Sequence, residues 1–435
     1  MRIEKGVVEM KKVFVFCAVA LMSVAALALE VTDVSGRQRW PWNGLVDVDF
    51  TLKDVASSET WYRIDIVASY LGVAGKGVHA QTFTSQPLVR GGGAHRIVWN
   101  MGTDCPNVLT DALTLRVTAA PLGDLEDVYL VIDLSGGPTA ASYPSRYTFA
   151  APDLSDDTCR TTELWLKRVP AGTFTMGTGT GSNKSLAAHA VRLTKPFFMA
   201  IFPTTQAQWA QVMGDWPSFF TNETYRAVRP VESVSWSRIR GHGGWYGDGT
   251  VLNGDTFVGR LRTKSARAGL DLPSEAQWEY VCRAGTTGDY YFNGTAVQVR
   301  SYARTAGWNG ETTDDRNYDL TMGTAKVGSY PANPWGFYDF YGNVCQLVPD
   351  GASKNDWTGI TFGPDVVDDP RWAFAVDMGV LFSGIRRGSS WQEIPGTVSS
   401  TCRRWTQYLD ATGTGGFTDR AGDRTYGFRI CVNAE

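Results

Sequence analysis

The stretch Pro-Ala-Asn-Pro-Trp-Gly-Phe-Tyr-Asp-Phe-Tyr-Gly-Asn-Val-Cys-Gln-Leu-Val-Pro-Asp, residues 331–350, decides how this chain folds. Its Gly and Pro residues break helices, and its Asn and Asp residues favour their own local backbone hydrogen bonds. It is not a linker either, because linkers lack such a density of Trp, Phe and Tyr. The stretch therefore predicts an ordered, turn-rich segment that buries aromatic rings around a rigid backbone.

The composition of the whole chain favours two folded domains that are rich in turns. The 435 residues exceed the length of one typical domain. The 16 Trp and 47 Gly favour loops and turns over a helical bundle. The net charge is −3, with acids and bases interspersed, so there is no electrostatic reason to expect nucleic acid or an anionic membrane as a partner.

The first 28 residues have the pattern of a secretory signal. A short basic start precedes the apolar run 13–29, which ends in Ala-Leu-Ala, so cleavage is expected after Ala28. Residues 1–9 are an upstream extension if Met10 is the true start. Because the apolar run is short for a membrane anchor, we expect export to the periplasm or the extracellular space. No membrane span is expected once the signal is removed.

Export leaves six cysteines in an oxidising compartment, where an even number favours disulfides. They are Cys105, Cys159, Cys282, Cys345, Cys402 and Cys431. Six cysteines allow 15 pairings, and their spacing selects none of them. Cys105 and Cys159 flank the stretch where we expect the domain boundary, so a bridge that ties the linker to the first domain is one option.

Residues 29–150 alternate apolar and polar side chains with a period of two. Five such runs are separated by clusters of Gly, Pro, Ser and Asp; they cover residues 45–52, 62–68, 95–99, 113–118 and 128–133. The pattern predicts an N-terminal, all-β, immunoglobulin-like sandwich of antiparallel strands. Nothing in it points to catalysis. Residues 151–162 are expected to form the linker to the second domain, which covers residues 163–435.

Two helices stand out among the short strands and turns of the second domain. The first is expected at residues 204–213, where Thr204 or Thr205 can cap the N-terminus and Gly214 ends the helix. The second follows Pro273. Ser274 is its N-cap, and the Gln three residues later completes a capping box.

Seven segments of the second domain resemble, in the same order, the formylglycine-generating enzyme family, also called the sulfatase-modifying factor family. They are PAGTFTMG (170–177), TTQAQW (204–209), RPVESVSW (229–236), LPSEAQWEYVCRAGT (272–286), NPWGFYDFYGNV (333–344), RGSSW (387–391) and YGFR (426–429). The resemblance implies an α/β domain with little regular secondary structure, related to C-type lectins, over residues 163–435. The N-terminal sandwich lies outside it.

The resemblance also implies where the chemistry should be, and this chain departs from the family there. In the family's enzymes, two cysteines five residues apart bind copper and drive the oxidation of a substrate cysteine by oxygen; thiolates are soft ligands that suit Cu(I). In the family, the essential cysteine directly follows an Arg, and the second cysteine lies five residues before the essential one. If Arg403 matches that Arg, Arg404 stands in place of the essential cysteine and Ser399 in place of the earlier one. Copper is therefore not expected. Cys402, next to two Arg, is the remaining candidate for a catalytic thiol.

A structural calcium site is a further implication of the resemblance. The family's G-N-V-W-E-W segment helps to bind Ca²⁺, an ion that prefers oxygen ligands. Here the segment contains Cys345 and Gln346 in place of the Trp-Glu pair, so the acid is lost. Asp339 and Asn343 remain as ligands of a weakened site.

A disulfide is implied as well. In some members the cysteine of the E-Y-x-C-R motif bonds to one just after G-F-R, and these positions are Cys282 and Cys431 here. That bridge would close a long loop and contribute about 4 kcal/mol on the chain-entropy model. Cys345 and Cys402 are then the leftover pair of the domain, and their pairing would consume the last candidate catalytic thiol.

Two functions follow. The first is a secreted, non-catalytic member that binds a protein, peptide or glycan, as the missing cysteine pair, the altered motifs and the appended sandwich suggest. The alternative is an oxidase of the sulfatase-modifying-factor type that acts on a cysteine-containing peptide. The candidates for a ligand surface are Trp391, Arg403, Arg404 and Trp405, with segments 351–382 and 408–424. For Arg404 and Trp405, a cation–π or packing pair is the structural alternative.

Overall fold

The computed structural model describes residues 29–39, 43–58, 60–70, 77–106, 108, 113–123, 127–179, 186–241, 253–306, 319–353, 365–370, 382–407 and 423–433. The predicted signal segment lies outside these ranges, and so does most of the predicted ligand segment 408–424. Within the described ranges, none of the helices has the length and apolar character needed to cross a membrane.

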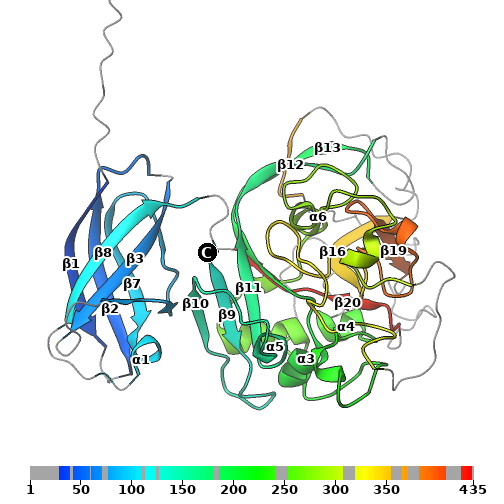
Figure 1. The fold of residues 1–435 in the computed structure, drawn as a ribbon, viewed down its shortest axis with the longest axis horizontal. Coiled ribbons are helices and arrows are strands. Elements are labelled where there is room, and N and C mark those ends of the chain that lie inside the picture. The colour runs from blue at the N-terminus through cyan, green and yellow to red at the C-terminus, as the bar shows by residue number, and fades with distance from the viewer. Residues whose placement is uncertain are drawn as a thin grey trace, which may run out of the picture.

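The first part of the chain is almost entirely β (Figure 1). Its elements are β1 (Glu30–Gln38), β2 (Leu45–Lys53), β3 (Trp61–Tyr70), β4 (Val78–His79), β5 (Thr82–Phe83), β6 (Leu88–Arg90), β7 (Gly93–Asn100), α1 (Met101–Asp104), β8 (Leu113–Pro121), β9 (Tyr129–Asp133) and β10 (Ser145–Thr148).

Two antiparallel arrangements form from strands β1 to β8. β2 lies between β1 and β7, while β3 pairs with β8, β6 and β4. Val46, Val48 and Phe50 of β2 and Ile64 of β3 are buried in one shared cluster, as the period-two pattern requires. This part of the chain is mostly β, as predicted, whereas the immunoglobulin-like sandwich as a separate domain stays a prediction.

One long antiparallel sheet crosses the predicted linker. Its order is β1-β2-β7-β5-β10-β9-β11-β14-β21-β15. The short strand β5 joins the strands β1, β2 and β7 to the rest of the sheet, because Phe83 pairs with Trp99 of β7 on one side and with Tyr147 of β10 on the other. β9 and β10, which the sequence pattern placed in the first domain, thus share a sheet with strands beyond residue 162. The boundary at residues 151–162 stays a prediction.

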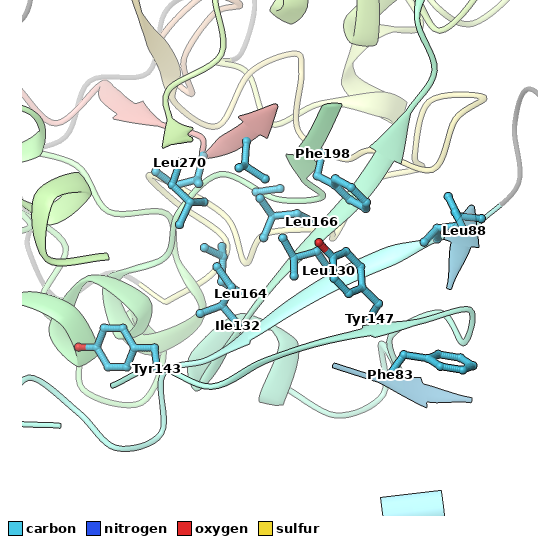
Figure 2. Packing of buried hydrophobic residues seen from close by; sticks show 14 of the residues in the cluster. Phe83, Leu88, Leu130, Ile132, Tyr143, Tyr147, Leu164, Leu166, Phe198 and Leu270 are labelled. Carbon is cyan, nitrogen blue, oxygen red and sulfur yellow. The ribbon is translucent and has the colours of Figure 1, made fainter. Parts of the chain in front are cut away.

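Apolar side chains cover one face of this sheet. Figure 2 shows Leu130, Leu166 and Phe198 gathered from neighbouring strands, with Tyr147 close by. Leu166 is opposite Leu130 in the strand register, and the Tyr147 and Phe198 rings have centroids 5.7 Å apart. The core of the C-terminal part therefore continues under β9 and β10.

The C-terminal part mixes short strands with short helices (Figure 1). Its elements are α2 (Thr158–Thr161), β11 (Glu163–Val169), β12 (Gly172–Met176), β13 (His189–Leu193), β14 (Phe197–Ala200), α3 (Gln206–Met213), η1 (Arg226–Val228), α4 (Trp236–Ile239), α5 (Phe257–Ser265), β15 (Leu270–Asp271), α6 (Glu275–Arg283), α7 (Val299–Tyr302), β16 (Cys345–Ser353), β17 (Val367–Asp368), β18 (Phe382–Arg387), η2 (Pro395–Thr397), β19 (Arg403–Gln407), β20 (Tyr426–Phe428) and β21 (Cys431–Asn433).

Both predicted helices are confirmed, with their caps. Thr205 and Gln208 form a capping box at the start of α3, and Gly214 ends that helix at φ 90°. Ser274 and Gln277 form the same box at the start of α6, where the Gln277 backbone N–H donates to the Ser274 hydroxyl at 3.2 Å. The local sequence therefore sets where both helices begin.

The stretch 331–350 is turn-rich over residues 331–344, as predicted, whereas residues 345–350 belong to strand β16. Residues 331–344, all of them described, contain no helix or strand. The side-chain oxygen Oδ1 of Asn333 accepts hydrogen bonds from the backbone N–H groups of Trp335 and Phe337, which take the place of helix or strand hydrogen bonds. At Gly342, with φ 67°, a β-carbon would lie 2.1 Å from the carbonyl oxygen of Arg304, so only glycine fits.

Candidate functional site

A four-stranded sheet, in the order β19-β18-β16-β20, carries the residues that the sequence singled out for chemistry. Neighbouring residues of a strand point to opposite faces. Arg387 is opposite Arg403 in the register, and Arg386 is opposite Arg404. We call the side with Arg387 and Arg403 the helix face, and the side with Arg386, Arg404 and Cys345 the thiol face.

The helix face forms a buried ion network with α6. Arg387 is fully buried, and its guanidinium pairs with Glu279 and, at 3.2 Å, with Glu275. Arg403 Nε donates to the same Glu275 at 2.7 Å. The Arg387 guanidinium also lies 5.0 Å from the centre of the Trp278 ring. These charges join the sheet to α6, so their role is structural.

The thiol face brings two cysteines and two arginines together. Arg386 Nη1 donates to the Cys345 sulfur at 3.5 Å, and Arg404 Nη2 lies 3.0 Å from a Glu393 carboxylate oxygen. Cys345 is fully buried, and Cys402 is 3% exposed. Burial raises the pKa of the Cys345 thiol, an effect that the Arg386 guanidinium only partly offsets, so Cys345 is neutral at pH 7.

Arg404 is electrostatically coupled to the second thiol. Burial opposes the charge of Arg404, but the Glu393 carboxylate and a hydrogen bond to Cys402 hold its pKa above the ordinary value. Arg386 rests over the ring of Tyr426, with its guanidinium carbon 4.5 Å from the ring centre. The result is a compact cluster in which each cysteine has an arginine beside it.

The structure separates the four predicted ligand residues. Trp391 is 2% exposed, and its indole N–H donates to the carbonyl oxygen of Arg424 at 3.0 Å. Arg403 is buried on the helix face. Arg404 lies on the thiol face, with a quarter of its side chain exposed. The side chain of Trp405 lies outside what the structure describes. Arg404 and Cys402 are therefore brought together, whereas Trp391 and Arg403 belong to the interior.

Within the predicted ligand segment 351–382, β17 pairs with β13, while residues 351–353 and 382 belong to β16 and β18. The Arg192 guanidinium pairs with Asp368, with Nε 2.8 Å from a carboxylate oxygen. The Thr194 backbone N–H donates to Asp369 at 2.9 Å. These two acids are consequently occupied by the chain itself, and residues 354–364 and 371–381 lie outside the described ranges.

The calcium site at Asp339 and Asn343 stays a prediction; in this structure both side chains bond to the backbone of the chain, and one buried Asp339 carboxyl oxygen has no partner among the described residues. The Asn343 side-chain amide is bonded through both its atoms to the backbone of Ala325, at 3.0 and 3.3 Å. One oxygen of the buried Asp339 carboxyl accepts the Gly328 N–H at 2.7 Å. Burial raises the pKa of Asp339, which favours its neutral form. Among the described residues, no group of three or more His, Cys, Asp or Glu could hold a metal, whereas Ca²⁺ takes about six to eight oxygens.

Gln346, which stands where the family has an acid, is a hub of the core. Its side-chain oxygen Oε1 accepts hydrogen bonds from Trp278 Nε1 at 2.9 Å and from Arg429 Nε at 3.0 Å. Its amide nitrogen donates to the carbonyl oxygen of Asp339 at 2.7 Å. The side chain is fully buried and all of these contacts are internal. The amide therefore serves the packing of residues 339–346 and does not supply a ligand oxygen.

The predicted disulfides stay predictions. Cys282 and Cys431 lie buried in the same core cluster, and burial raises the pKa of the Cys282 thiol to about 12. Cys345 and Cys402 are thiols of the same face. Cys105 and Cys159 belong to different core clusters.

Sequence reasoning missed Arg386, Glu393 and Tyr426 as members of the thiol face. The signal for Arg386 was available, because it precedes Arg387 of the RGSSW segment and must point the opposite way in a strand. Glu393 and Tyr426 carry no local signal. They reach Arg404 and Arg386 from a loop and from a separate strand.

A second concave site lies beside the turn-rich stretch. It is a cavity of about 320 Å³ whose lining includes Asp127, Lys167, Pro334 and Trp335. The Lys167 ammonium is already held by Asp127 at 2.6 Å and by the carbonyl oxygen of Trp335 at 2.8 Å. Arg168 also lines the cavity, so Asp127 offsets only one of two cations; we rank the cavity below the thiol face because none of the site residues predicted from the sequence line it.

Comparison with known proteins places the C-terminal part in a family. The model of the "Sulfatase-modifying factor enzyme 1-like domain" matches residues 153–434. The mouse formylglycine-generating enzyme is 27% identical over 163 residues, which is 37% of this chain and 37% of that enzyme, so the chain matches little more than a third of that relative. The mouse protein named "Inactive C-alpha-formylglycine-generating enzyme 2" is 26% identical over 298 residues, 61% of this chain and 85% of that protein. The solved structure of Treponema denticola variable protein 1 aligns with a TM-score of 0.46 at 20% identity, over 63% of this chain and 96% of that one. Since the family model matches more than half of its residues, this chain belongs to the sulfatase-modifying factor family.

Proposed function

We propose that this chain is an exported, non-catalytic member of the family that binds a protein, peptide or glycan. The proposal rests on one observation: Ser399 and Arg404 stand at the two positions where the resemblance implies copper-binding cysteines. Ser399 has its hydroxyl 3.3 Å from the hydroxyl of Thr401, and Arg404 pairs with Glu393. A guanidinium cannot bind a soft cation and would repel it.

The state of the two remaining thiols supports the same proposal. A catalytic cysteine reacts as its thiolate from a partly exposed position. Cys345 is fully buried with a raised pKa, and Cys402 is almost fully buried. A relative named inactive matches this chain over most of its own length, which shows that the family includes a member described without the activity.

The test uses the secreted full-length protein and two measurements. The first is oxygen consumption after copper loading, with a Cys-x-Pro-x-Arg peptide as substrate. The second is binding to a glycan and peptide array. We expect no turnover above the copper-only control and specific binding on the array. Turnover that Cys402→Ser abolishes would refute the proposal and establish the oxidase alternative.

A further inference from the structure

We infer that the thiol face binds a carboxylate group through Arg386 and Arg404. This inference rests on the proposed binding function and gives the chemical class that the ligand must carry.

Two arginine N–H donors on the thiol face lack a hydrogen-bond acceptor among the described residues. The Nε–H groups of Arg386 and Arg404 are both buried, and neither has a hydrogen-bond acceptor among the residues that the structure describes. Buried polar groups are nearly always bonded, and an unmet one calls for a partner such as a water, an ion or a ligand. The neighbouring Arg387 and Arg403, on the helix face, reach the Glu275 carboxylate, although the Nε–H of Arg387 is itself unmet among the described residues.

The position of the two side chains favours an anionic ligand. Arg386 and Arg404 are directly opposite in the antiparallel pair β18–β19. Directly opposed side chains have Cβ atoms about 5 Å apart, and like charges in that position repel. An anion that contacts both guanidinium groups removes this repulsion. The exposed quarter of the Arg404 side chain gives a ligand its approach from solvent.

The groups around the pair do not neutralise it fully. Glu393 contacts Arg404, while Arg386 contacts the Cys345 thiol, which is a weak acceptor. Glu393 and, more weakly, Asp423 act on Arg386 at longer range, but Glu393 pairs with Arg404, and one Asp423 carboxylate oxygen accepts both the backbone N–H and the hydroxyl of Thr425. Arg386 therefore lacks a close carboxylate of its own among the described residues.

The geometry of the guanidinium groups matches a carboxylate ligand. A guanidinium presents a planar fork of N–H donors that fits the two oxygens of a carboxylate. A single negative charge suits the site, since Glu393 already offsets one of the two arginines. A dianion such as sulfate would leave excess negative charge beside Glu393. The carboxylate can belong to a peptide or to an acidic sugar, which share this chemistry.

The experiment measures thermal unfolding of the full chain while sodium acetate replaces sodium chloride at constant ionic strength. Acetate should raise the unfolding midpoint in a saturable way, because a ligand that binds the folded state stabilises it. Arg386→Gln and Arg404→Gln should each weaken acetate binding at least tenfold. Arg192→Gln, which removes the same charge from an exposed pair with Asp368, should leave it unchanged.

Further variants keep the result interpretable. Arg404→Lys retains the charge and should still lose most of the acetate binding, because the fork is gone. N-acetylglycine represents a peptide carboxylate and glucuronate an acidic sugar, and the tighter of the two identifies the source. Folding of each variant is checked by circular dichroism.

Two results would overturn the inference. One is an acetate response that is absent, or equal in Arg386→Gln and Arg192→Gln. The other is a thiolate absorbance near 240 nm at neutral pH that Arg386→Gln abolishes, which would make a cysteine of this face the partner of the guanidinium groups. Array binding with no acetate response would end this inference alone. Oxygen turnover would end the proposed function and leave an acetate result standing.

Discussion

Replacing Arg387 by Met tests whether the buried ion network holds the four-stranded sheet on α6. Met keeps most of the aliphatic volume but removes the charge, and the side chain is fully buried between Glu275 and Glu279. Breaking a buried pair by removing one partner costs about 3–5 kcal/mol, because an uncompensated charge stays behind. Each acid keeps one arginine, Arg403 for Glu275 and Arg283 for Glu279. We therefore expect a loss near the lower end, about 3 kcal/mol.

The matched control is Arg192→Met, which makes the same chemical change in an exposed pair. The side chains of Arg192 and Asp368 are 55% and 45% exposed, so the loss should be about 0–1 kcal/mol. Urea unfolding followed by Trp fluorescence at pH 7 gives the free energy of unfolding of each variant. Equal losses in Arg387→Met and Arg192→Met would refute the reasoning.

Three further predictions follow from the core. Gly342→Ala should destabilise the fold by about 1–3 kcal/mol in the same urea assay, because φ is 67° and the new methyl would meet the carbonyl oxygen of Arg304; an unchanged midpoint would contradict this. Burial raises the folded pKa of Asp339 above its ordinary value of 3.8, so the folded state loses stability as the pH rises from there through the folded pKa. The stability of Asp339→Asn relative to the parent should therefore grow from pH 4 to pH 7, and a flat difference would count against it. Peptide mapping of the secreted protein should find Cys282 joined to Cys431, and recovery of both as thiols would disprove the bridge.

Much of the local structure was predictable from the sequence because its causes are local. The two capping boxes depend on residues three positions apart, so Thr205 and Ser274 mark the helix starts without any tertiary information. The same holds for the turn-rich stretch, where Asn333 bonds to backbone groups two and four residues ahead. The period-two runs gave the strands of the N-terminal part for the same reason.

The sheet order was not predictable, because it depends on partners that no local pattern names. β9 pairs with β11 across the predicted linker, and a strand of only two residues connects the long sheet. The alternating pattern is satisfied whether β9 packs on the first domain or on the second. Its buried face alone therefore could not decide between them.

The functional site shows the same division between local and distant causes. Strand periodicity requires Arg386 and Arg387 to point to opposite faces, as it does for Arg403 and Arg404. Which face meets α6 depends on Glu275, which is 112 residues from Arg387 in the sequence.

In each strand, one arginine binds the acids of α6, as Arg387 and Arg403 do, and its neighbour lies on the thiol face beside the cysteines. The helix face needs Arg387 and Arg403 for stability. Among the described residues, the Glu393 carboxylate offsets the charge of Arg404, whereas Arg386 has no paired carboxylate, and the mutual repulsion of the two arginines opposes its charge. A charge that the fold does not require is best explained by a ligand that does, and the thiol face is where that ligand should be sought.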